Sequence, residues 1–123
     1  MSKKFEKTRD LPEMQSEWLW AEDLQGKDVT LTISRVGVET LQNVDGKEDK
    51  TVLDFAEMDK RPKENRKRLG LNKTNIKTIE KLHGKHLDGW IGKQITLYPT
   101  RAQAFGEMVD CIRVRPQVKA RPV

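Results

Sequence analysis

The sequence contains one cysteine, Cys111, among its 123 residues. A single thiol cannot form an internal disulfide, and without neighbouring ligands it cannot build a zinc site, which is typical of a reducing compartment. No run of 18 apolar residues occurs, and no apolar segment follows the basic start at residues 1–4. Neither a membrane span nor a signal peptide is expected. We therefore expect a soluble, cytoplasmic protein with no membrane partner.

Motifs that carry catalytic chemistry are also lacking. We find no nucleophile and base pair, no glycine-rich phosphate loop and no cluster of carboxylates at fixed spacing. His83 and His86 could share a metal ion with Asp88, but a positively charged helix C-terminus is the favoured interpretation. We therefore expect no enzymatic activity, no cofactor and no metal site.

Aromatic residues make up only 6% of the chain and hydrophobic residues 35%, which is enough for one modest core. Charged residues also make up 35%, and they are unevenly placed. Residues 1–59 carry 8 Lys and Arg against 14 Asp and Glu, whereas residues 60–123 carry 16 against 5. The basic second half favours a polyanionic partner, with an ordinary solvated surface as the alternative.

Alternation of apolar and polar residues predicts five strands. The first is long, at residues 27–39, and its apolar phase slips by one residue beside Gly37, which indicates a β-bulge or a sharp bend. Residues 43–46 (NVDG) predict a turn. Pro99 is expected to end the fourth strand. The remaining strands are expected at residues 51–56, 68–71, 94–98 and 108–115.

One helix is expected between the third and fourth strands. Asn72 can cap its start, Ile76, Ile79 and Leu82 form an apolar stripe, and Gly84 is a natural stop. The order strand, strand, strand, helix, strand, strand predicts an all-β protein with one short helix, an OB-fold-like five-stranded barrel. A small SH3-like barrel is the alternative, which the helix disfavours.

The predicted domain covers residues 17–116. The polar residues 1–16 are expected to be a flexible tail, and residues 117–123 a disordered basic tail. Trp18 and Trp20 stand just inside this domain. Their spacing places both indoles on one side of an extended segment, where they could cap the core, form a partner surface or stack on bases. A cap over the core is the favoured interpretation, because large aromatic residues are usually buried.

Residues 60–68 hold six cations and one anion. They are predicted to form the tip and arm of a hairpin between the second and third strands, beside the groove in which OB-folds bind ligands. Single-strand binders combine such a cationic groove with aromatic rings on which bases stack. Phe55 and Trp90 are assigned to the core instead. The predicted nucleic-acid-binding residues are Lys60, Arg61, Lys63, Arg66, Lys67, Arg68, Lys73, Tyr98, Arg101, Phe105, Arg113 and Arg115.

Four segments carry a resemblance to a known group of proteins: residues 26–33 (GKDVTLTI), 71–75 (LNKTN), 90–98 (WIGKQITLY) and 111–116 (CIRVRP). With these segments the chain resembles, over about residues 17–116, small phage and prophage proteins. The resemblance implies an OB-fold accessory protein of phage replication or recombination, in the cytoplasm of a bacterial host.

The expected function is therefore non-enzymatic binding of single-stranded DNA, with RNA as a further ligand and a replication, recombination or host protein as a further partner. The alternative is a protein-interaction barrel that binds or inhibits a host protein or a ribonucleoprotein. The oligomeric state is left open by the sequence.

Overall fold

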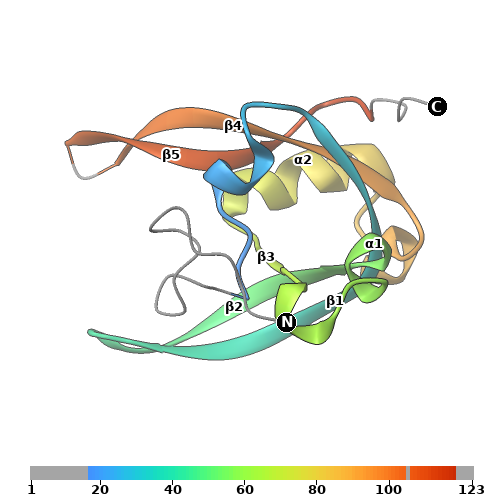
Figure 1. The fold of residues 1–123 in the computed structure, drawn as a ribbon, viewed down its shortest axis with the longest axis horizontal. Coiled ribbons are helices and arrows are strands. Elements are labelled where there is room, and N and C mark those ends of the chain that lie inside the picture. Colours follow the sequence, from blue (N-terminus) through green and yellow to red (C-terminus); the bar gives the residue numbers. More distant parts are fainter. Residues whose placement is uncertain (1–16, 105, 119–123) are drawn as a thin grey trace, which may run out of the picture.

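The structure, a computed structural model, describes residues 17–104 and 106–118. The predicted tail at residues 1–16, most of the C-terminal tail, and Phe105 lie outside the described residues. Five antiparallel strands form one sheet (Figure 1), in the order β3-β2-β1-β4-β5. The strands are β1 (Val29–Asn43), β2 (Gly46–Phe55), β3 (Leu69–Gly70), β4 (Gln94–Ala104) and β5 (Glu107–Val114).

The helices are the single turn α1 (Ala56–Asp59) and the longer α2 (Lys73–His83). The mostly-β class and the helix between the third and fourth strands are thereby confirmed. Closure into a barrel is not confirmed, because no ladder joins the edge strands β3 and β5 within the described residues.

The β1–β2 hairpin extends much further than the predicted strands. Its ladder reaches the pair Asn43 and Gly46, so the turn falls at the predicted place, with Gly46 at a positive φ of 125°. The outer half of the hairpin is mostly polar, and its two apolar residues in β1, Val38 and Leu41, do not alternate regularly, which explains why the sequence did not predict it. Cross-strand polar pairs hold it instead, such as the Thr40 hydroxyl donating to the Asp49 carboxylate at 2.7 Å.

The predicted bulge exists, but its predicted position beside Gly37 is wrong. The register of β1 against β2 shifts between Ile33 and Arg35, while Gly37 pairs regularly with Val52. The shift carries Ile33 and Val36, three residues apart, to the same side of the strand, and both contribute to the core. The prediction placed the bulge beside the glycine, but the bulge lies where the apolar pattern shifts, between Ile33 and Val36.

Pro99 does not end β4, contrary to expectation. Its cross-strand partner is Ile112, whose carbonyl accepts a hydrogen bond from the Asn75 side chain of α2 at 3.1 Å and therefore points away from β4. The two residues thus form a non-hydrogen-bonded pair, in which β5 needs no N–H from Pro99. On the other side, the ladder with β1 has already ended at Leu97. No neighbouring strand therefore needs the donor that proline lacks.

The segment between β2 and β3 is not the predicted hairpin arm. Only two residue pairs join these strands, Val52 with Gly70 and Leu53 with Leu69. The chain between them forms α1, which continues directly from β2, and a short 3₁₀ turn at Lys63–Asn65. The basic residues therefore lie on an irregular connection and not on a β-ribbon.

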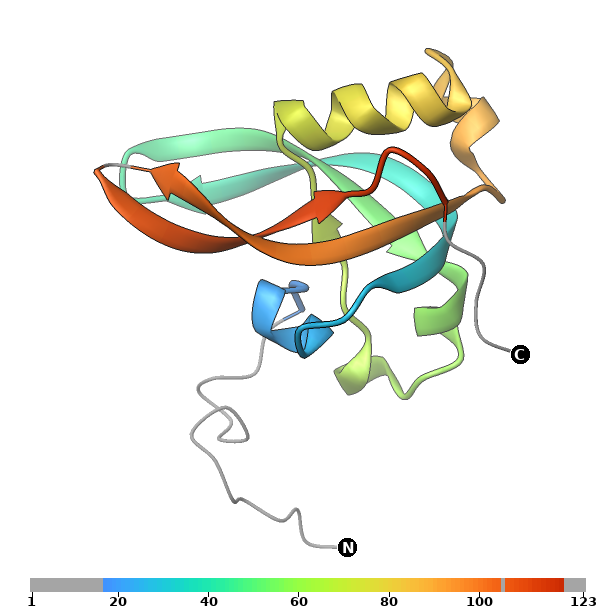
Figure 2. The ribbon, with the colours of Figure 1, turned by 90° about the horizontal axis from the view of Figure 1, so that it is seen from above.

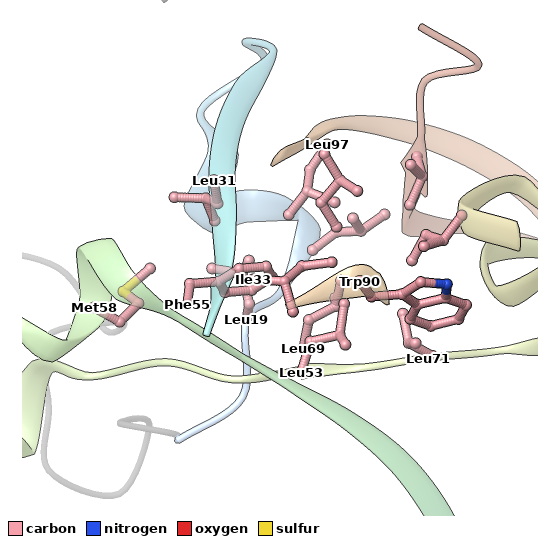
Figure 3. Close-up of a cluster of buried hydrophobic side chains, with 14 of the residues drawn as sticks. Leu19, Leu31, Ile33, Leu53, Phe55, Met58, Leu69, Leu71, Trp90 and Leu97 are labelled. Carbon is pink, nitrogen blue, oxygen red and sulfur yellow. The ribbon is translucent and has the colours of Figure 1, made fainter. Parts of the chain in front are cut away.

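Helix α2 follows the expected signals. The Asn72 side chain accepts from the Asn75 N–H at 2.8 Å, and Gly84 caps the other end at a φ of 93°. Ile79 is fully buried in the core, together with Phe55 and Trp90, as predicted for both aromatics (Figure 3). No helix in the described ranges is long and apolar enough to cross a membrane.

An N-terminal arm, residues 17–24, occupies the space in which β3 and β5 would have to meet. The Leu19 N–H donates to the Arg68 carbonyl at 2.8 Å, and the Arg68 N–H donates to the Glu17 carbonyl at 2.7 Å. The arm continues into a 3₁₀ turn, Ala21–Leu24, that contacts β4 and β5. Figures 1 and 2 show this blue segment below the β4–β5 hairpin. The arm thus fills the open side of the sheet.

We predict that Glu57→Ala destabilises the fold. The Glu57 carboxylate accepts from the Thr32 N–H at 2.7 Å and from its hydroxyl at 2.8 Å, next to the bulge of β1. Its removal takes two hydrogen bonds from a partly buried site, so the free energy of unfolding in urea should fall by about 1–3 kcal/mol. As a control, Glu107→Ala removes an exposed carboxylate and should change it by less than about 0.5 kcal/mol. Equal effects of the two variants would contradict this role for Glu57.

Candidate functional site

The predicted cations do not form one groove. The stretch at residues 60–66, called here the basic loop, follows α1 at the end of β2 remote from the β1–β2 turn. Strand β2 is 10 residues long, so it spans about 33 Å at 3.3 Å per residue, and it separates that turn from α1 and the loop. Figure 1 shows the same separation, with α1 on one side of the molecule and both hairpin turns on the other.

The basic loop presents its charges to solvent. Lys60, Arg61 and Lys63 are exposed, and none of them pairs with a carboxylate whose side chain the structure describes. Arg66 is also exposed, but it holds the loop together: Nε donates to the Arg61 carbonyl at 3.0 Å and Nη2 to the Asp59 carbonyl at 3.1 Å. The loop is therefore a cationic surface whose backbone is held in place by Arg66.

Arg68 is held by carboxylates on the outer face of the sheet. Its Nε donates to Asp54 and its Nη1 to Glu39, both at 2.6 Å. Partial burial acts to lower the pKa of Arg68, but the hydrogen bonds and charges of Asp54 and Glu39 outweigh it and raise the pKa above its usual value. The guanidinium therefore stays charged to strongly alkaline pH, and its contribution to stability is constant across the neutral range. Arg35 adds a longer contact to Asp54 at 3.6 Å.

A groove of about 320 Å³ lies between the arm and this outer face. Its lining residues are Trp18, Leu19, Trp20, Leu41, Lys50 and Gly70. The indole of Trp20 is 54% exposed, whereas Trp18 is half-buried with the Arg68 guanidinium 6.0 Å from its ring centre. A Cβ at Gly70 would lie 3.3 Å from Cε of Lys50, so the missing side chain gives the lysine room to cross β3.

Tyr98 and Arg115 contact each other on the outer face of β4 and β5. The guanidinium of Arg115 lies 3.7 Å from the ring centre of Tyr98 and donates twice to Asp28, at 3.1 Å each. The hydrogen bonds to Asp28 raise the pKa of Arg115 above its usual value. Arg113, opposite Tyr98 in the ladder, has a buried Nη1 without a hydrogen-bond partner among the described residues. These three predicted residues are neighbours, but one stacking face of the tyrosine is occupied.

The remaining predicted residues are dispersed. Arg101 is exposed on β4 and faces Asp110 at 3.4 Å. Lys67 contacts Asp23 of the arm at 3.9 Å, and Lys73 is exposed in the first turn of α2, which holds no acidic residue. Phe105 lies outside the described residues.

The sequence did not predict that Leu41, Lys50 and Gly70 line the groove. The alternation signal was absent in the outer hairpin, and only the register of β2 against β1 and β3 brings these residues to one face beside the arm. For Trp18 and Trp20, the favoured prediction is a cap over the core. Trp18 is half-buried, but Trp20 is 54% exposed, so this prediction is wrong for Trp20.

The two histidines do not form a metal site with other described residues. The His83 ring makes a 2.7 Å hydrogen bond with the Gln94 carbonyl, and residues 17–104 and 106–118 contain no group of three His, Cys, Asp or Glu that could hold a metal ion. No known family, curated protein or solved structure matches this chain.

We predict that Arg68→Met lowers the free energy of unfolding by about 1–3 kcal/mol, because Asp54 and Glu39 lose their common donor while partly buried. Arg101→Met is the matched control. Its ion pair is 68% and 73% exposed, and exposed pairs contribute at most about 1 kcal/mol. Urea denaturation of both variants checks this; an Arg101 variant as unstable as the Arg68 variant would contradict it.

Proposed function

We propose that this protein is a non-enzymatic binder of single-stranded nucleic acid, with DNA as its main ligand, and that the strand lies along the groove between the arm and the β1–β2–β3 face. The observation that carries the proposal is Trp20, an indole more than half exposed at the wall of a groove that Lys50 also lines. Binders that tolerate many sequences use this combination of a stacking ring and a cation.

The arrangement of the strands supports the proposal. A strand β1 shared by β2 and β4, and a helix between β3 and β4, agree with an OB-fold, a partly open Greek-key barrel. OB-folds bind oligonucleotides on the face of strands 2 and 3, between the loops that join strands 1 to 2 and 4 to 5. The groove lies on the corresponding face. The OB-fold assignment is part of this proposal.

The basic loop would supply most of the phosphate contacts. It is joined to the groove through Lys67 and Arg68, which contact the arm at Asp23 and Trp18. A strand that stacks on Trp20 and follows the arm therefore approaches Lys63, Arg61 and Lys60. As part of the same proposal, the protein acts together with a replication or recombination protein that uses single-stranded DNA.

Trp20→Ala should weaken binding of a fluorescent oligo-dT by about 1–3 kcal/mol, roughly five- to 150-fold, because one base loses its stacking partner. Ile91→Ala is the control: this side chain is 45% exposed but does not line the groove. Fluorescence anisotropy at low salt, with duplex DNA and oligo-U in parallel, gives the affinities. Unchanged oligo-dT affinity in the Trp20 variant would remove the groove from the site.

A triple variant of the basic loop, with Lys60, Arg61 and Lys63 changed to Ala, tests the phosphate contacts. The slope of log affinity against log salt should become shallower by about 2, since each lost phosphate contact on a single strand contributes about 0.7.

The matched control changes Lys77, Lys81 and Lys85 to Ala, which removes the same charge from the exposed side of α2 and its C-terminal end. The control should keep the wild-type slope. Equal slopes for both triple variants would show that only overall charge matters. Failure of the wild type to bind any oligonucleotide at low salt would overturn the proposal and favour a protein-interaction module.

A further inference from the structure

A second pocket, of about 180 Å³, lies where the sheet is open between the edges of β3 and β5. We call it the seam pocket. Its lining residues are Leu19, Trp20, Ala21, Leu69, Gly70, Asn72, Asn75, Asp110, Cys111 and Ile112. One water occupies about 30 Å³ in the liquid, so the pocket has room for a small ring. It is contiguous with the groove, because Leu19, Trp20 and Gly70 line both.

Asn75 lines this pocket and carries an unused hydrogen-bond acceptor. The residue is only 2% exposed, its Nδ2 donates to the Ile112 carbonyl at 3.1 Å, and its N–H is bound by Asn72. Its Oδ1 is buried and has no hydrogen-bond partner among the described residues. A buried polar atom without a partner costs free energy. A ligand N–H that donates to Oδ1 would remove this free-energy cost.

The composition of the pocket indicates the class of ligand. Asp110 is the only charged residue in the lining, so nothing there compensates a phosphate. An indole and the amide groups of Asn72 and Asn75 suit a flat, neutral ring with N–H and carbonyl groups on its edge. Nucleobases in single strands are recognised in this way, by stacking on an aromatic ring and hydrogen bonding along the base edge.

We propose that the seam pocket receives one nucleobase of the bound strand, whose N–H donates to Oδ1 of Asn75. This inference rests on the proposed function. The Trp20 indole forms the outer wall, and its backbone N–H bonds within the arm, to Asp23 at 2.7 Å. Oδ1 is buried in the free protein, so the base reaches it only after the pocket widens, and the Trp20 ring then lies against the entering base. Asn75 is thereby a residue that determines base preference.

The test compares a short oligo-dT with an oligonucleotide of the same length made of N3-methylthymidine, which keeps the stacking ring but lacks the ring N–H. Wild-type protein should bind the methylated strand about tenfold more weakly. In Asn75→Leu, which has similar volume and no acceptor, the two strands should bind equally. Gln94→Leu, which removes an exposed side-chain amide outside the pocket and the groove, should keep the tenfold preference.

Circular dichroism establishes that each variant is folded. Should Asn75→Leu not fold, side-chain amide NMR of the wild type replaces it: the Asn75 amide signals should move with oligo-dT and stay in place with the methylated strand. Equal affinity of the wild type for both strands, or an undiminished preference in folded Asn75→Leu, overturns the base pocket and leaves strand binding intact. Absence of binding to either strand at low salt overturns the proposed function itself, and the base pocket with it.

Discussion

The change of partner along β1 is the constraint on which the rest of the structure depends. Residues 29–32 pair with β4, and from Ile33 onward the strand pairs with β2. At this corner the Ile33 N–H also donates to the Lys93 carbonyl, and its own carbonyl accepts from the Gly92 N–H. Where β2 has ended, Glu57 of α1 replaces it as the acceptor for Thr32. One strand thus joins both halves of the sheet, and the N–H groups of Thr32 and Ile33 at the corner both have acceptors.

Because the two halves diverge from this corner, their far edges do not meet. Strand β3 is only two residues long and pairs with β2 alone, and the arm lies between it and β5. Leu19 anchors the arm in the core, while Trp20 stays exposed. The groove and the seam pocket exist on either side of this inserted segment, and they share Trp20 and Gly70. The open sheet is therefore what creates the candidate binding surface.

Charge in the sequence and charge available to a ligand differ for a physical reason. Arg68 and Arg115 are each bound by acidic residues from the first half of the chain, Asp54 and Glu39 in one case and Asp28 in the other. The acidic first half thus neutralises part of the basic second half across the sheet. No described carboxylate binds Lys60, Arg61 or Lys63 of the basic loop. Their positive charge therefore remains available to a polyanionic ligand, as the composition indicated.

Local signals in the sequence determined the strand positions near the core, the Asn72 and Gly84 caps, the turn at residues 43–46 and the burial of Phe55 and Trp90, because each depends on alternation or on backbone preferences of a few neighbouring residues. Only the tertiary structure decided the length of the β1–β2 hairpin, the continuation of β4 through Pro99 and the place of the bulge. These depend on which residues face each other across strands. The groove also depends on tertiary structure, because Lys50, Gly70 and Trp20 come together only through the strand register and the packing of the arm.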